Sequence, residues 1–418
     1  MNYPDLHSLI ICRSLLEDAV VSAMLAVLAQ PQDRCCQSRL AGALVEKAEQ
    51  LGLTGNLLPQ YLMYLLGEGQ NAAARSIEAH GQNGAGLQQV LRHDMELLWP
   101  YLHIPTSSLT SLAVLDDYAP ARPVSYEYLD QLCRKLQQAR SAEEGTNTLL
   151  EQYCRYGSGQ LARYIAFRVN TTGKLTGIEN FPQLDFSDLI GYEKQKEKLR
   201  LNTENFIQDR QANNVLLTGS RGTGKSTAVK ALVNMYHEEG LRLIQLTRSQ
   251  MDRLAAVMET LQRIQSKKFI LFFDDLSFDE DDREYKYLKS VIDGGVTPQP
   301  DNVLIYATSN RRHLLKETWK ERNDDLDEVY RHDSVNESIS LSDRFGLILH
   351  YAEPTQAEYL QMIDHELKKE GILLPAETLR IEGVRWEMEH SGRNGRIASQ
   401  FVKWYLGNYQ QPGPAALS

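Results

Sequence analysis

The glycine-rich loop GSRGTGKS constrains this chain more than any other feature, because the apolar run NVLLTG leads into it and the helical pattern STAVKALVNMY follows it. Glycines let the backbone curl so that its N–H groups surround a phosphate. The lysine neutralises phosphate oxygens, and the serine hydroxyl can ligate Mg²⁺. We therefore expect a strand, a phosphate-binding loop and a helix in succession. The residues expected to bind a nucleotide here are Gly219, Ser220, Arg221, Gly222, Thr223, Gly224, Lys225, Ser226 and Thr227.

Short apolar runs alternate with helical stretches after this point: LRLIQL, FILFFDD, VLIYATS and LILHYA. Near-continuous apolar strands separated by helices indicate a parallel sheet that is buried on both faces. We expect an α/β nucleotide-binding domain over residues 186–353, a helical unit over 354–410 and a tail over 411–418. The charged stretch 316–340 is expected to be a solvated surface segment, or alternatively a subunit contact.

The first part of the chain has a different pattern of apolar residues. Apolar residues recur there at spacings of three and four, which places them on one face of a helix. This pattern predicts an all-helical domain over residues 1–155. A bridging segment over 156–185 is rich in Gly, Asn and Thr, and Tyr164, Ile165, Phe167 and Val169 could form an ordered piece docked on a neighbour.

Composition narrows the class of protein. The chain has 418 residues and a net charge of -10, which gives no electrostatic push toward nucleic acid or an anionic membrane. Nucleic acid binding is thus possible but not indicated. Five cysteines without metal-ligand spacing indicate reduced thiols and a cytoplasmic protein. The apolar run from Ala19 to Ala29 is too short to cross a membrane.

Two acidic residues follow the apolar run FILFF. Asp274 would hold Mg²⁺ through water, and Asp275 would orient an attacking water, if their strand neighbours the strand of the glycine-rich loop. The alternative is a strand that ends at two solvated acids. Asp is one methylene shorter than the Glu that often fills the second place, so water activation could be slow.

Three further polar positions follow later strands. Asn310 stands at the tip of a strand that could lie between the other two, where its carboxamide could reach a phosphate or the water; it could also be a turn residue. Arg344 precedes the last strand, and its fork geometry suits phosphate oxygens. Arg393 and Arg396 begin a helix near the end. A surface ion pair is the alternative for each arginine.

The order of these motifs resembles that of the AAA+ ATPases, from about Leu184 to Tyr409. FSDLIGYEKQKEKL is similar to the adenine-side segment, GSRGTGKS to Walker A and the Asp–Asp pair to Walker B. Asn310 is similarly placed to sensor 1, SDRFG resembles the arginine-finger box, and GRNGR resembles sensor 2. More closely, NVLLTGSRGTGKST, LIGYEKQKE and SLSDRFGL resemble an uncharacterised bacterial family of single-AAA+ predicted ATPases, named only for a domain of unknown function.

The resemblance implies a P-loop NTPase fold, with a five-stranded parallel sheet and a C-terminal helical lid after the all-helical domain. It implies ATP or ADP and Mg²⁺ as ligands, and hydrolysis of ATP. The resemblance also implies roles for single residues. Leu189 and Ile190 would contact the adenine, Lys225, Ser226 and Asp274 would bind Mg·ATP, and Asp275 and Asn310 would position the water. Arg344 would act as an arginine finger in trans, and Arg396, or alternatively Arg393, would sense the nucleotide.

A finger in trans implies a homo-oligomeric ring or arc, possibly a hexamer, and the helical domain would recognise a protein partner. No aromatic–apolar–Gly pore loop follows LRLIQLTR, so polypeptide threading is not expected. Three alternatives stay open: a nucleotide-sensing scaffold with negligible turnover, a DNA-associated initiator or helicase-loader-like ATPase, and, more weakly, a small-molecule kinase.

Overall fold

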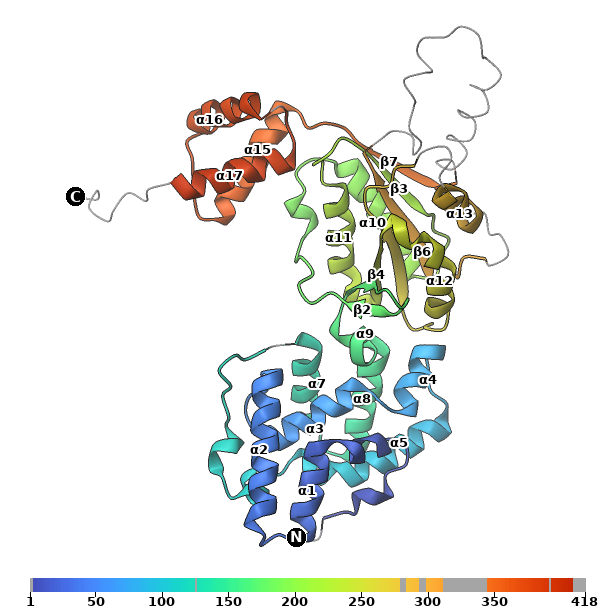
Figure 1. The fold of residues 1–418 in the computed structure, drawn as a ribbon, viewed down its shortest axis with the longest axis vertical. Coiled ribbons are helices and arrows are strands. Elements are labelled where there is room, and N and C mark those ends of the chain that lie inside the picture. The colour runs from blue at the N-terminus through green and yellow to red at the C-terminus, as the bar shows by residue number, and fades with distance from the viewer. Residues whose placement is uncertain are drawn as a thin grey trace, which may run out of the picture. The chain divides into compact units, whose positions relative to one another are not determined.

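The computed structural model describes residues 3–124, 126–278, 283–292, 298–310, 344–390 and 392–408 (Figure 1). The charged stretch 316–340 and the tail 411–418 lie outside the described residues. The chain divides into two compact units. The first is Met1–Ile165 with Glu238–Gly240 and Arg263–Lys267, and the second is Ala166–His237, Leu241–Gln262 and Lys268–Ser418.

The first unit is helical, as the apolar spacing predicts. Its helices are α1 Ala19–Ala29, α2 Arg34–Leu51, α3 Leu57–Glu68, α4 Ala72–His80, α5 Ala85–Leu98, α6 Ser107–Thr110, α7 Glu127–Gln138, α8 Ala142–Tyr156 and α9 Gly159–Arg163. Polar side chains fix several starts, because Asp18, Asp33 and Asn71 each accept a backbone N–H in the first turn of α1, α2 and α4.

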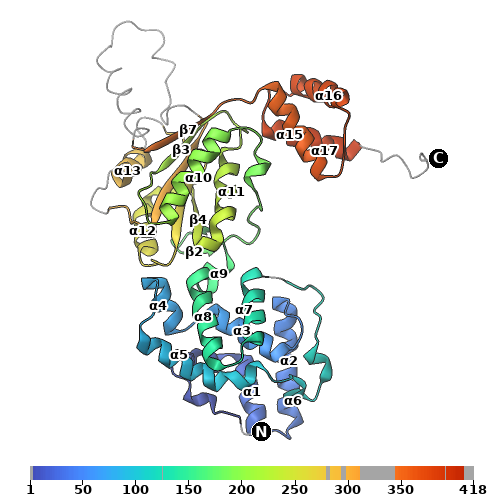
Figure 2. The same ribbon diagram turned by 180° about the vertical axis from the view of Figure 1, so that it is seen from behind.

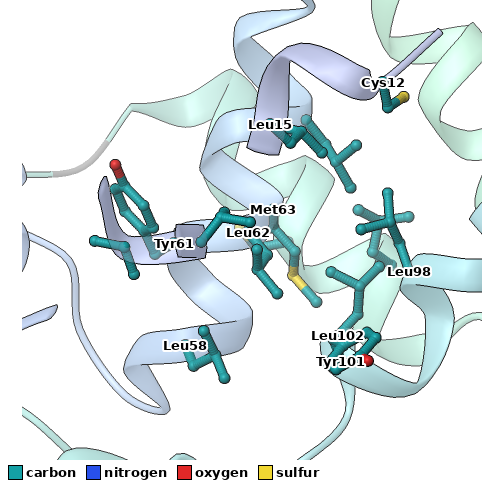
Figure 3. Packing of buried hydrophobic residues seen from close by; sticks show 14 of the residues in the cluster. Cys12, Leu15, Leu58, Tyr61, Leu62, Met63, Leu98, Tyr101 and Leu102 are labelled. Carbon is teal, nitrogen blue, oxygen red and sulfur yellow. The ribbon is translucent and has the colours of Figure 1, made fainter. Parts of the chain in front are cut away.

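The core of this unit gathers apolar side chains from segments far apart in the sequence. Figure 3 shows Leu15, Leu62 and Leu98, from three separate segments, packed in this core. One buried carboxylate, Asp94 of α5, is satisfied there because it accepts the backbone N–H groups of residues 10–12, each at 2.8 Å. These bonds fasten the start of the chain to α5.

The second unit is built on a sheet of seven strands in the order β2-β1-β4-β5-β6-β3-β7. The strands are β1 Ala166–Val169, β2 Leu175–Gly177, β3 Val215–Gly219, β4 Leu241–Leu246, β5 Lys268–Phe273, β6 Val303–Ser309 and β7 Leu347–Tyr351. All neighbouring pairs are parallel except β1 with β2. Strands β3 and β6 are buried along their whole length, as expected for a sheet covered on both faces.

The sheet is larger than the five strands expected. The five predicted parallel strands are present, but the bridging segment adds β1 and β2 at one edge. Phe167 of β1 lies opposite Ile244 of β4, so the apolar residues of the bridge do dock on a neighbour. The extra strands were not predicted because a four-residue strand is too short to show a pattern of its own.

Helices complete the second unit: α10 Glu193–Ile207, α11 Lys225–Tyr236, α12 Leu254–Gln262, α13 Arg283–Ile292, α15 Gln356–Lys369, α16 Ala376–Glu389 and α17 Gly395–Asn408. The last three group together as a helical lid (Figures 1 and 2), with Ile363, Leu379 and Phe401 in a shared core. The predicted α/β fold is confirmed in its parts: a mostly parallel sheet with the glycine-rich loop between β3 and α11, a helical lid after the sheet and a helical N-terminal unit.

Among the residues described, no helix combines the length and the apolar character needed to cross a membrane.

Candidate nucleotide-binding site

The glycine-rich loop joins the end of β3 to the start of α11, as the sequence predicts. The backbone conformation requires glycine at two positions of the loop, and at the first of them a close contact with the backbone of β7 requires it as well. A Cβ on Gly219 (φ 134°) would lie 1.9 Å from Tyr351 O, and one on Gly224 (φ 86°) would lie 2.1 Å from Leu189 Cδ1. The loop can therefore curl tightly against β7 and the adenine-side segment, and the N-terminal N–H groups of α11 are left to face a phosphate.

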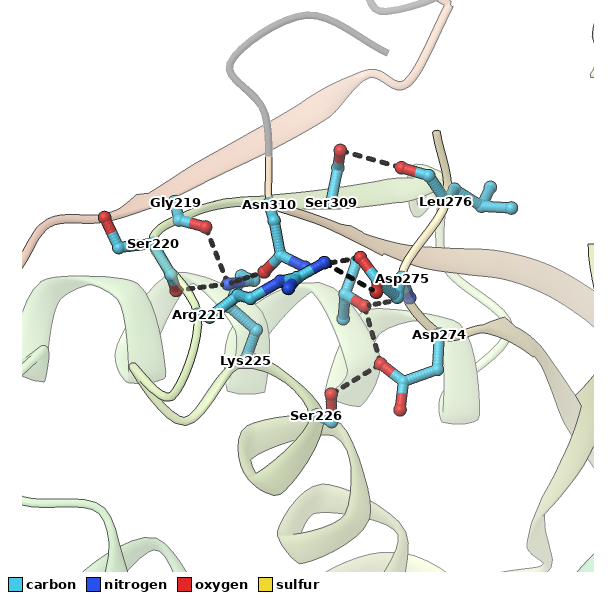
Figure 4. Close-up of polar contacts among 11 residues, drawn as sticks. Gly219, Ser220, Arg221, Lys225, Ser226, Asp274, Asp275, Leu276, Ser309 and Asn310 are labelled. Carbon is cyan, nitrogen blue, oxygen red and sulfur yellow. Dashed lines mark hydrogen bonds and ion pairs between the residues drawn. The ribbon is translucent and has the colours of Figure 1, made fainter. Parts of the chain in front are cut away.

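Lys225 is folded back onto this loop. Its Nζ donates to Gly219 O and Ser220 O, each at 2.7 Å, and to Asn310 Oδ1 at 3.2 Å (Figure 4). Burial lowers the pKa of this ammonium group, while the nearby Asp275 and Asp274 carboxylates act in the opposite direction. A phosphate would add negative charge beside a buried cation that is held by carbonyl dipoles.

Asp274 and Ser226 meet, although β5, which precedes Asp274, and β3, which leads into the loop before Ser226, are not neighbours. Strand β6 lies between β5 and β3, so the expectation of directly adjacent strands is wrong, and the strand that carries Asn310 does lie between the other two. Ser226 Oγ donates to Asp274 Oδ1 at 2.5 Å, and Thr308 Oγ1 of β6 donates to the same oxygen at 2.7 Å. The hydroxyl and the carboxylate are oxygen donors of the kind that Mg²⁺ prefers, so these residues fit the expected ion.

Asp275 is held in a defined position. Its backbone has φ 59°, a conformation that Asp tolerates better than most residues, and its N–H donates to Thr308 Oγ1 at 2.8 Å. One carboxylate oxygen accepts from Asn310 Nδ2, and the other lies 4.0 Å from Arg221 Nη2. Lys225, Asn310, Asp275 and Arg221 thus form a connected row of polar groups (Figure 4).

The three candidate arginines lie in different surroundings. Arg396, in the first turn of α17, lines the cavity at the loop. Arg393 is not among the residues that line it and pairs with Glu387 at 2.5 Å. Arg344 is exposed just before β7 and does not line the cavity either. Of Arg393 and Arg396, only Arg396 lines the cavity.

The cavity that unites these groups has a volume of about 930 Å³. Among the predicted residues, it is lined by Leu189, Ile190, Arg221, Gly222, Thr223, Gly224, Lys225, Ser226, Thr227, Asp274, Asp275, Asn310 and Arg396. Gly219, Ser220 and Arg344 are not in its lining. The lining residues that sequence reasoning missed come from four places, the end of the bridging segment, the adenine-side segment, strand β6 and the lid: Gln183, Leu184, Asp188, Thr308, Met362, His365, Glu366, Lys369, Gly395 and Ser399.

The adenine-side segment is organised by a buried lysine that the sequence did not single out. Lys196 of α10 donates to Leu189 O at 2.8 Å and to Phe186 O at 3.3 Å, and pairs with Glu193 at 2.7 Å. These bonds fix the path of the chain just before Ile190. No motif marks Lys196, because it is one of several lysines in a highly charged helix.

The lid also touches the loop directly. The N–H of Gly395, at the start of α17, donates to Gly222 O at 2.9 Å. Arg396, the next residue, is thereby placed beside the loop. Residues from the loop, the sheet and the lid therefore enclose one cavity with a buried ammonium group and two carboxylates at its polar end.

A family model described as a protein of unknown function (DUF815) matches residues 162–409, more than half of the 418-residue chain. This match agrees with the expected family resemblance, and it includes β1 and β2. A comparison with curated proteins found no match.

Several solved structures are similar to part of the chain. The Thermotoga maritima RuvB Holliday junction branch migration motor is 20% identical, with a TM-score of 0.36, and the match covers 53% of this chain and 64% of that chain. C. elegans PCH-2 is 15% identical, with a TM-score of 0.37, and the match covers 54% and 65%. The E. coli MS115-1 HORMA:CdnC:Trip13 complex contains a chain that is 13% identical, with a TM-score of 0.40 and coverage of 54% and 84%.

The matched region spans less than two thirds of the RuvB and PCH-2 chains. At these identities and TM-scores, the likeness carries no argument about a ligand, an activity or a partner.

Proposed function

The chain belongs to the family described as protein of unknown function (DUF815) and carries a glycine-rich loop on a mostly parallel sheet, and from this premise we propose that it is a Mg·ATP-dependent ATPase of the AAA+ type. In this proposal it works as a homo-oligomer, a ring or an arc, whose subunits change shape with the state of the nucleotide. The helical N-terminal unit recognises a protein partner, because every residue expected at the nucleotide comes from the second unit.

The observation that carries the proposal is a set of hydrogen bonds that joins the first two residues of α11 to the polar residues after β5 and β6. Lys225 Nζ reaches Asn310 Oδ1, and the amide of Asn310 donates to Asp275. Ser226 Oγ donates to Asp274. A cation, an amide and two carboxylates from three separate strand ends thus converge beside one phosphate-binding loop.

These residues can divide the work of ATP hydrolysis between them. Lys225 and the N–H groups of α11 hold the phosphates. Mg²⁺, held by Ser226 and Asp274, supplies charge neutralisation at the phosphate oxygens when bound. Asp275 then orients the attacking water, and the bond from Asn310 keeps its carboxylate directed toward that water.

Arg344 completes the proposed site from an adjacent subunit. Its exposed position before β7 and its place outside the lining of its own cavity support action in trans. In this proposal its guanidinium stabilises the charge that develops on the γ-phosphate, which is worth roughly 10³- to 10⁵-fold in rate where such a finger operates.

Two substitutions test the assignment. Lys225→Ala should abolish binding of a fluorescent ATP analogue, because the buried cation at the phosphates is lost. Arg344→Ala should bind the analogue normally but release phosphate about a thousandfold more slowly or worse. Arg393→Ala is the matched control, because that arginine pairs with Glu387 and does not line the cavity. Normal phosphate release by Arg344→Ala would remove the finger assignment.

A nucleotide-sensing scaffold is the second candidate, and the engagement of Asp275 favours it. One of its oxygens accepts from Asn310 and the other lies 4.0 Å from Arg221, so the first oxygen would have to give up the amide bond before it could accept a proton from a water. Tight ATP binding with phosphate release at background for every protein concentration would select this candidate over the ATPase.

A further inference from the structure

A carboxylate at the adenine side of the cavity faces two basic side chains of the lid. Asp188 ends the short 3-10 helix η5 (Phe186–Asp188), and its Oδ2 accepts the N–H of Asp185 at 2.7 Å. Its Oδ1 accepts from Lys369 Nζ and lies 3.9 Å from His365 Nε2. Because the backbone bond fixes one oxygen, the other is held toward α15. Asp188, His365 and Lys369 all line the cavity.

This contact lies at the far end of α15 from the connection between the sheet and the lid. At the near end, Tyr192 OH donates to Ala352 O at 2.7 Å, just before α15 begins. At 1.5 Å per residue, the 14 residues of α15 place Lys369 about 20 Å along the helix from its start. A small rotation of the lid about the near end would therefore move Lys369 far from Asp188.

The neighbouring lysine makes a different kind of contact. Lys368 pairs with Asp364 of the same helix at 2.5 Å, and its side chain is exposed to nearly the same extent as that of Lys369, 54% against 50%. Lys368 can stabilise α15 but cannot join it to the adenine-side segment. Of these two lysines, Lys369 alone connects the lid to a residue 181 positions away.

We propose that Asp188 and Lys369 form an ion-pair latch that holds α15 against the adenine-side segment and sets how long a nucleotide stays in the cavity. The effect on nucleotide retention rests on the proposed function, but the contact itself requires no ligand. Opening the latch would let the far end of α15 swing away from the adenine side, which is the side from which the base would leave.

The test measures release of a fluorescent ADP analogue from the full chain by stopped flow. Lys369→Met should speed release about two- to fivefold, the range expected for one partly exposed ion pair. Asp188→Asn should have the same effect, because the amide oxygen still accepts the Asp185 N–H. The double variant should be no faster than either single one. Lys368→Met should leave release unchanged.

A second measurement is independent of nucleotide. Hydrogen exchange of residues 185–190 and of the end of α15 should speed up in Lys369→Met and stay unchanged in Lys368→Met. Equal release rates and equal exchange in wild type, Lys368→Met and Lys369→Met would overturn the latch. If the wild type binds no nucleotide, the proposed function fails, and unchanged exchange in Lys369→Met would then overturn the latch separately.

Discussion

Thr308 is the residue on which both candidate carboxylates depend. Its side chain is buried, and its hydroxyl donates to Asp274 Oδ1 at 2.7 Å. The hydroxyl oxygen, Thr308 Oγ1, in turn accepts the N–H of Asp275 at 2.8 Å. Because β6 separates β5 from β3, this hydroxyl bridges the gap between the strand of the loop and the strand of the acids. Thr308 is therefore a positioning residue, which orients the carboxylates without being required to touch a phosphate.

Replacing Thr308 by Val keeps the shape of the side chain but removes the hydroxyl. We expect Thr308→Val to cost about 1–3 kcal/mol of stability, since the N–H of Asp275 loses its partner. We also expect Mg²⁺ to be needed at higher concentration for nucleotide binding, because Asp274 loses a donor that orients it. Thr308→Ser keeps the hydroxyl and is the control. Thermal unfolding and Mg²⁺ titrations check both effects, and a Val variant that matches the Ser variant in both would contradict the role.

The residues of the site fall into two groups, those that the sequence predicts and those that it does not. Lys225, Asp274 and Asn310 could be predicted, because each follows an apolar strand and the carboxyl ends of parallel strands share one edge of the sheet. Asp188 and Lys369 could not be predicted, because their meeting is decided by how the lid packs and neither lies in a motif. Their roles, like that of Arg344, stay predictions until measured.

At the scale of elements, strand β1 shows that part of the bridging segment belongs to the sheet. It pairs with β4 on one side and with β2 on the other, so it is an internal strand of the sheet and not a linker. The side chain of Phe167 is 1% exposed, while that of the next residue, Arg168, points to solvent. Phe167 and Val169 therefore share the buried face of the strand, and Arg168 lies on the other face.

Substitutions in β1 should separate these two faces. Phe167→Ala should cost about 3–5 kcal/mol, because it removes a large buried side chain and leaves a cavity. Arg168→Ala should change stability by less than about 0.5 kcal/mol. The shift of the thermal midpoint in each variant measures the difference. A small shift for Phe167→Ala would mean that β1 is not part of the stable sheet in solution.

The five longer strands could be predicted from composition, since apolar runs of five to seven residues between helical stretches leave few other folds. Their spatial order could not, because the sequence does not say which strand lies beside which. The expected adjacency of the acid strand and the loop strand was wrong for this reason.

At the scale of the whole molecule, an arginine finger in trans makes activity depend on assembly. We expect phosphate release per subunit to rise with protein concentration and then level off as subunits associate, and we expect Arg344→Ala to show no such rise. Phosphate release measured over a dilution series, with the molar mass from light scattering at each point, checks this. Turnover per subunit that stays constant while the molar mass changes would contradict the trans arrangement.

The hydrogen bonds between Asp94 and the backbone of residues 10–12 limit how far the chain can be shortened at its N-terminus. A version trimmed to begin at α1 would keep the acid inside an apolar interior and discard the three amides that solvate it. Such a trimmed protein would be prone to misfold even though every α-helix is retained. Shortened forms should begin upstream of Ile10.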